Sequence, residues 1–186
     1  MTTLDRRRLL LAAVASAVAA ACGSTGASAS PSRSPSPSPS PSQSTTASKA
    51  TIELAKGGSF SFALRPDKAP QTVARFAQKA RSGFYQGLTF HRVEDWVVQG
   101  GDPTGSGSGG AQVASEYNDL PFVAGAVGIA RTPNPAQMND SQFFIVKIDS
   151  HHLDGLYANF GLLNPADMPV VQGIKIGDKI KAIKIE

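Results

Sequence analysis

The sequence has few side chains of the kinds that carry out nucleophilic or metal-dependent chemistry. Its only cysteine is Cys22, and its histidines are His91, His151 and His152. The two adjacent histidines would point apart on an extended or turn backbone, and no third ligand stands at the spacing of a zinc site. The Gly-x-Ser-x-Gly motif of serine hydrolases is also missing. We therefore expect no metal and no cofactor, and a function based on binding or on a reaction without covalent chemistry.

The sequence also disfavours two further classes of ligand, nucleotides and nucleic acids. The glycine-rich stretch 100–110 lacks the Gly-Lys-Ser/Thr ending of a phosphate-binding loop, and Pro103 removes a backbone N–H that such a loop would use. The net charge is +4, but 13 basic and 13 acidic side chains follow Ala50, so the excess positive charge lies near the N-terminus. The sequence therefore predicts neither a nucleotide site nor a nucleic-acid surface.

The first 21 residues are typical of an export signal. Arg6, Arg7 and Arg8 precede an apolar stretch, Leu9–Ala21, that is too short for a membrane span of about 20 apolar residues. The junction before Cys22 resembles the lipobox of bacterial lipoproteins. We expect Cys22 to be lipidated and to anchor the protein on the outer face of the cytoplasmic membrane or in the periplasm. An ordinary secretory signal with Cys22 as a free thiol is the alternative, and export by the general or the twin-arginine route stays open.

Residues 22–49 are predicted to form a tether. Ser, Pro, Ala and Thr dominate this stretch, Ser and Pro alternate from Ser34 to Ser42, and almost nothing apolar is available for burial. Alternating proline favours an extended chain of about 3 Å per residue, which would hold the following domain away from a surface. A glycosylated stalk is the alternative.

Residues 50–186 have the pattern of a β-rich domain. Ile52–Leu54 and Phe60–Leu64 alternate in polarity on either side of a Lys-Gly-Gly turn, which predicts a hairpin. Pro70–Ser82 has an apolar helical face and is followed by Gly83, which predicts a helix with a glycine stop. Six further runs have strand character: Leu88–Val93, Trp96–Gln99, Val127–Ala130, Gln142–Ile148, Asn159–Leu163 and Ile180–Ile185. Many short strands with few helices predict an all-β barrel or sandwich.

Four blocks, in this order, resemble the cyclophilin-type peptidyl-prolyl cis-trans isomerases. They are Pro66–Pro70 continuing through Ser82–Tyr85, Phe90–Val93 with Gln99–Gly105, Ser141–Ile145, and His152–Tyr157 with Phe160-Gly161. The similarity spans 51–186. It implies an all-β fold, a closed eight-stranded antiparallel barrel capped by one clear helix and a second, short helix in 164–177. We expect a monomer.

The resemblance also implies an activity and a site. Cyclophilins bind proline-containing segments of unfolded or folding proteins and accelerate rotation about the X-Pro bond. Arg92 would be catalytic, because a fixed cation can favour the twisted peptide bond over its planar forms. Neighbouring strand residues face opposite sides, so Phe143 and Phe144 cannot both point into the barrel. The resemblance implies that Phe144 forms the floor of the proline pocket and that Phe143 belongs to the core. The other substrate-binding residues that the resemblance implies are His91, Trp96, Val97, Gln99, Ala130, Arg131, Leu153 and Tyr157. A proline-peptide-binding chaperone or adhesion lipoprotein with weak turnover is the alternative.

Two departures from the family pattern lie beside the implied site. The segment between Arg92 and Gln99 is one residue shorter than in many relatives, with Trp96 in place of the usual phenylalanine. His152 stands where many eukaryotic members have a tryptophan that contacts the inhibitor cyclosporin. We therefore predict that cyclosporin binds weakly. A nanomolar inhibition constant in a protease-coupled peptide assay would contradict this prediction.

Overall fold

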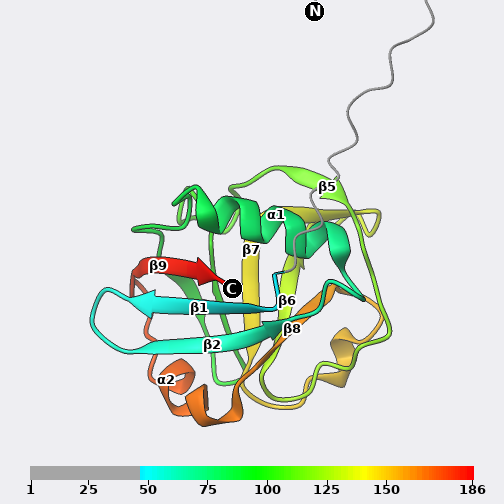
Figure 1. The fold of residues 1–186 in the computed structure, drawn as a ribbon. Coiled ribbons are helices and arrows are strands. Elements are labelled where there is room, and N and C mark those ends of the chain that lie inside the picture. The colour runs from blue at the N-terminus through cyan, green and yellow to red at the C-terminus, as the bar shows by residue number, and fades with distance from the viewer. Residues whose placement is uncertain (1–46) are drawn as a thin grey trace, which may run out of the picture. The chain divides into compact units, whose positions relative to one another are not determined.

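The computed structural model describes residues 47–186, so the expected export signal, Cys22 and nearly all of the tether lie outside the described residues. The described chain forms one curled antiparallel sheet, with α1 at one end and α2 at the other (Figure 1). The strands are β1 (Lys49–Leu54), β2 (Ser59–Leu64), β3 (Phe90–Val93), β4 (Val97–Gly100), β5 (Gln112–Ala114), β6 (Ala126–Arg131), β7 (Gln137–Val146), β8 (Asn159–Leu163) and β9 (Ile180–Ile185). The helices are α1 (Pro70–Arg81) and α2 (Met168–Gln172), with short 3-10 helices η1 (His151–Leu153) and η2 (Pro165–Asp167). Within 47–186, no helix has the length and apolar character needed to cross a membrane.

The first hairpin and the helix follow the local signals in the sequence. In the β1–β2 hairpin Ile52 lies opposite Phe60, and both side chains are buried. Helix α1 has Pro70 at its first turn, where the missing N–H leaves no hydrogen bond unmade. At its other end Gly83 adopts a φ of 75°, and the N–H groups of Gly83 and Phe84 donate to the carbonyls of Ala80 and Lys79. Both predicted elements, including the glycine stop, are confirmed.

The predicted strands are present, with one addition. The sheet order is β3-β4-β7-β6-β8-β2-β1-β9, and β5 pairs separately with β7. Strand β5 was not predicted, because it has three residues and only Val113 among them is a strong strand former. The short second helix is confirmed as the five-residue α2.

The expected closed barrel is wrong, because the two end strands of the sheet share no ladder. Between β3 and β9 there is only an isolated bridge, Thr89 with Lys179. Backbone hydrogen bonds join 87–90 to 177–180 and go no further. Gly87 and Gly177 lie at the two ends of this contact and have φ values of 81° and 89°. This backbone conformation is typical of tight turns, and the two segments pair no further. The sheet is therefore an open, curled half-barrel with a short seam.

The apolar side chains form two separate clusters. The larger lies inside the curled sheet and under α1, where the ring of Phe76 packs 5.2–5.8 Å from those of Phe62, Tyr85, Phe143 and Phe160. The smaller contains Val97, Phe122, Ala126, Phe144, Val146 and Leu153, with Trp96 and Tyr157 partly buried against it. Phe143 and Phe144 lie in different clusters because neighbouring residues of a strand face opposite sides of the sheet. The outer cluster is where a site can form.

Candidate active site

A row of directly opposite residues crosses four neighbouring strands. Arg92 of β3 faces Gln99 of β4, Gln99 faces Phe144 of β7, and Phe144 faces Gly128 of β6. Side chains that are directly opposite in an antiparallel sheet share one face. Gly128 is required in this row, since a Cβ there would lie 2.4 Å from the Phe144 ring and 2.7 Å from the Phe122 ring. The row therefore presents a cation, an amide and an aromatic ring side by side.

A β-bulge at His91 directs Arg92 to this face. Phe90 is fully buried in the inner cluster and lies opposite Gly100, whereas Arg92 lies opposite Gln99. The ladder shifts by one residue between them, with His91 as the extra residue. Simple alternation would place Phe90 and Arg92 on the same face, so the bulge is what brings the guanidinium out of the core side.

The outer cluster borders a small pocket of about 120 Å³, whose lining combines apolar side chains with polar and charged ones. Phe144 is 5% exposed and stacks on Phe122, with ring centroids 5.6 Å apart. Tyr157 meets Phe144 edge to face at 5.5 Å. The complete lining is Arg92, Trp96, Val97, Gln99, Ala130, Arg131, Phe144, Leu153 and Tyr157. The hollow has hydrocarbon walls and a polar mouth that includes two guanidinium groups.

Arg92 is held by neighbours on both sides of its guanidinium. Its Nε donates to Glu94 Oε1 at 2.6 Å, and one terminal nitrogen donates to Gln99 Oε1 at 3.4 Å. Its guanidinium carbon lies 5.3 Å from the centre of the Trp96 ring. The hydrogen bond from Arg92, helped by one from Trp96, lowers the pKa of Glu94, so the carboxylate is charged at neutral pH. The side chain of Arg92 stays 43% exposed and faces the pocket mouth.

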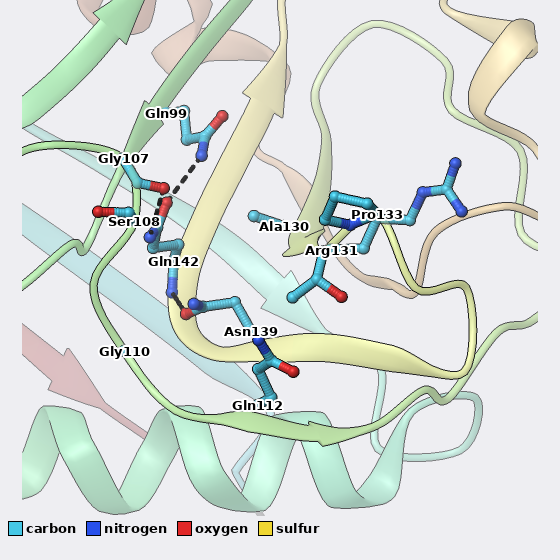
Figure 2. A pocket seen from close by; sticks show the side chains of 11 residues that line it. Gln99, Gly107, Ser108, Gly110, Gln112, Ala130, Arg131, Pro133, Asn139 and Gln142 are labelled. Atoms are coloured by element: carbon cyan, nitrogen blue, oxygen red, sulfur yellow. Dashed lines mark hydrogen bonds between the residues drawn. The ribbon is translucent and has the colours of Figure 1, made fainter. Parts of the chain in front are cut away.

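A second, larger pocket of about 310 Å³ adjoins the first and shares Gln99, Ala130 and Arg131 with it. Figure 2 shows Gln142 at the centre of the hydrogen bonds between the residues that line this pocket. Its side-chain nitrogen donates to the carbonyls of Gly107 and Gly109, and its oxygen accepts from Gln99 at 2.9 Å. Gln142 is only 2% exposed, so these bonds fix it firmly. Together with the Gln99 contact to Arg92, they form a chain from the buried strand to the guanidinium.

The glycine-rich loop beside the second pocket is organised by a buried carboxylate. Asp102, 1% exposed, accepts hydrogen bonds from the backbone and hydroxyl of Thr104 and from the backbone of Gly107. Burial opposes ionisation of Asp102, but these hydrogen bonds outweigh it and lower its pKa. The loop is therefore folded around the buried Asp102 carboxylate and forms one side of the second pocket. Within 47–186, no group of three metal-binding side chains lies close enough together to hold an ion.

The structure brings together nine of the ten residues that the sequence assigned to the site in this domain; all nine line the smaller pocket. His91 lines neither pocket; it lies near Gly107, and both ring nitrogens are buried without a hydrogen-bond partner among residues 47–186. Sequence reasoning missed Phe122, Gln142 and Glu94. Gln142 could have been found from the sequence, because a polar residue next to two phenylalanines in a strand needs a hydrogen-bond partner when it is buried. Phe122 could not, because it lies in a proline-containing loop far from the motifs.

Comparison with known proteins agrees with this fold and identifies the family. The model of the family described as "Cyclophilin type peptidyl-prolyl cis-trans isomerase/CLD" matches residues 49–186. A peptidyl-prolyl cis-trans isomerase of Synechococcus elongatus is 37% identical over 142 residues, covering 74% of this chain and 96% of the relative. The peptidyl-prolyl cis-trans isomerase B of Bacillus subtilis is 38% identical over 138 residues, covering 72% and 94%. This chain belongs to the cyclophilin-type peptidyl-prolyl cis-trans isomerase family.

A solved structure supports the same assignment. The cyclophilin type peptidyl-prolyl cis-trans isomerase of Cryptosporidium parvum, crystallised in the presence of the dipeptide Ala-Pro, has a TM-score of 0.65 to this chain. The two sequences are 27% identical, and the match covers 74% of this chain and 98% of that one. The mostly-β fold with two helices is therefore the cyclophilin fold.

The burial of His91 predicts a specific pH dependence of stability. Burial, with a smaller effect of Arg92, lowers the pKa of His91, while Asp102 opposes this. The unfolded chain then binds more protons than the folded one below the ordinary histidine pKa of about 6.5. The free energy of unfolding therefore falls as the pH drops from about 6.5 towards the folded pKa. Urea denaturation of the wild type is expected to show this dependence of the free energy of unfolding on pH. The measurement runs between about pH 5 and 8, a range chosen around the ordinary histidine pKa. The pH dependence is expected to weaken in His91→Gln and to persist in the exposed control His152→Gln.

Proposed function

We propose that residues 49–186 catalyse rotation about X-Pro peptide bonds, with Arg92 as the catalytic residue above the pocket floored by Phe144. The observation that carries this proposal is the cross-strand row that sets a guanidinium beside an apolar hollow. Family membership supports the same reaction. The substrates we propose are proline-containing segments of unfolded or folding proteins, bound by a monomer.

The smaller pocket suits a proline ring. A pyrrolidine ring is apolar and its nitrogen has no N–H, so burial against Phe144, Leu153 and Tyr157 leaves no donor unsatisfied. The crystal form of the Cryptosporidium parvum relative with Ala-Pro points to the same kind of ligand. The ring would be held while the preceding carbonyl turns.

The chemistry requires stabilisation of a twisted amide. Rotation about an unaided X-Pro bond takes tens to hundreds of seconds, because its partial double bond gives a barrier of about 18–20 kcal/mol. In the twisted state, the proline nitrogen becomes pyramidal and regains a lone pair that can accept a hydrogen bond. A guanidinium directed at that nitrogen binds the twisted state more strongly than either planar state, which lowers the barrier. Arg92 would supply this donor from its terminal nitrogens, since its Nε is bonded to Glu94.

The adjoining pocket and strand β6 would receive the residues next to the proline. Ala130 lies at an irregularity of the ladder, between Ile129 and Arg131, and has no partner residue on either neighbouring strand. A backbone segment that departs from regular strand pairing is suited to pair with an extended peptide. This supports a role for Ala130 through its main chain.

Replacement of Arg92 tests the proposed catalytic role. We expect Arg92→Ala to lower kcat/KM on a short X-Pro peptide by about a hundredfold, the usual loss when a transition-state donor is removed. Arg81→Ala removes an exposed arginine at the end of α1 and is expected to leave the rate unchanged. The assay is protease-coupled isomerisation, with circular dichroism to confirm folding. Equal rates for wild type and Arg92→Ala would leave only the proline-peptide-binding module.

We also propose export and anchoring through Cys22, supported by the apolar N-terminal stretch and the junction before Cys22. The 22–49 segment would then act as the tether of the isomerase outside the cytoplasm. Mass spectrometry of the mature protein is expected to find Cys22 as the first residue, with acyl chains attached. Cys22→Ser is expected to release the protein from the membrane fraction. A mature chain that begins at Cys22 with an unmodified thiol would refute the anchor while leaving export intact.

A further inference from the structure

The turn between β3 and β4 places an acidic residue between two walls of the pocket. The N–H of Glu94 donates to the carbonyl of Val97 at 2.8 Å, so only Asp95 and Trp96 form the turn. Arg92, Glu94 and Trp96 are therefore close in space as well as in sequence. Arg92 and Trp96 line the smaller pocket, whereas Glu94 does not.

Glu94 uses its two oxygens on two different partners. Oε1 accepts from Arg92 Nε at 2.6 Å, and Oε2 accepts from Trp96 Nε1 at 2.8 Å. Both partners end in planar groups, and their separation of 5.3 Å between guanidinium carbon and ring centre allows one carboxylate to hold both. This leaves the terminal nitrogens of the guanidinium available at the pocket mouth.

We propose that Glu94 is a positioning residue of the isomerase site, which sets the orientation of Arg92 and Trp96 toward the bound proline. The inference rests on the proposed function, because it concerns how Arg92 is held for that reaction. Glu94 acts through its two neighbours and makes no contact with substrate.

The geometry makes Glu94 the stronger of two restraints on Arg92. The second restraint is the hydrogen bond from the guanidinium to Gln99 Oε1, which at 3.4 Å is long and therefore weak. A charge-assisted bond of 2.6 Å is in the strong class. Without it, the arginine would be free to occupy several rotamers at the half-exposed pocket mouth, and fewer molecules would hold the donor in place.

A carboxylate is required because both partners are donors. Arg92 Nε and Trp96 Nε1 each present an N–H, so the acceptor needs two oxygens. A glutamine has one oxygen and one NH₂ group, and the NH₂ would face one of the two donors. Glu94→Gln therefore removes one of the two contacts at almost constant size, and an exposed carboxylate in the same turn, Asp95, provides a matched control.

The contact also predicts how acid acts on the site. Hydrogen bonding from Arg92 and from Trp96 lowers the pKa of Glu94, so both contacts persist at neutral pH and are lost only when the pH falls below the usual glutamate range. The other charged or titratable groups around Trp96 are His152, whose ring lies 5.4 Å away, Lys147, whose N–H bonds to the Trp96 carbonyl, and Asp95. Of these, His152 faces the indole directly, so it is replaced in the measurement.

The test uses the fluorescence of Trp96, the only tryptophan of the chain. In full-length protein with His152→Gln as a common background, Glu94→Gln is expected to shift the emission of Trp96 and to abolish its titration in the acid range. Asp95→Asn is expected to change neither. Kinetically, Glu94→Gln is expected to lower kcat by about tenfold, as for a misplaced catalytic group, with KM within about twofold. Asp95→Asn is expected to keep both parameters.

The possible results separate the two proposals. A wild type without isomerase activity would overturn the proposed function, and the fluorescence would still report whether Glu94 holds Trp96. An active wild type with unchanged kcat in Glu94→Gln would overturn the positioning role, whether or not the emission moves. A large fall in kcat with the same fall in Asp95→Asn would also overturn it, because the loss would then belong to the turn in general.

Discussion

Strand β7 is buried on both faces, and both apolar clusters form against it. Residues 141–146 are all buried, and the side chains of 143–146 alternate between the inner cluster and the outer one. Each fully buried phenylalanine stabilises the fold by about 1.5–3 kcal/mol. Phe143 anchors the interior and Phe144 anchors the outer cluster, so the floor of the smaller pocket is at the same time a stabilising element. A change at Phe144 therefore affects both the site and the fold.

Two local irregularities turn this packed sheet into a site. The bulge at His91 moves Arg92 to the outer face, and the pairing of β6 with β7 is also irregular at Ala130, which lines the same pocket. Gly128 completes the arrangement by leaving space for Phe144 and Phe122 to stack. The regular parts of the ladder supply rigidity, while the two irregular points change which side chains reach the pocket.

The sequence predicted the elements well because their signals are local. Alternation marked the β1–β2 hairpin, and Pro70 with Gly83 marked the ends of α1. The family resemblance implied the residues that line the smaller pocket, and five of them lie within the matching blocks: Arg92, Gln99, Phe144, Leu153 and Tyr157. The face occupied by Arg92 could not be read from alternation, because it depends on a one-residue shift in pairing with β4. The open edge between β3 and β9 and the contribution of Phe122 depend on contacts between distant segments, which no local pattern encodes.

The short seam between β3 and β9 gives the hairpin that carries Arg92 a particular freedom. Beyond Phe90, strand β3 is paired on one side only, while β7 holds β4 along its full length. Low-energy fluctuations concentrate where few backbone bonds must break. Small hinging of this hairpin about β4 would change the gap between the guanidinium and the aromatic floor and leave the interior intact. Such a motion would allow the same pocket to bind the cis and the trans isomer of one peptide.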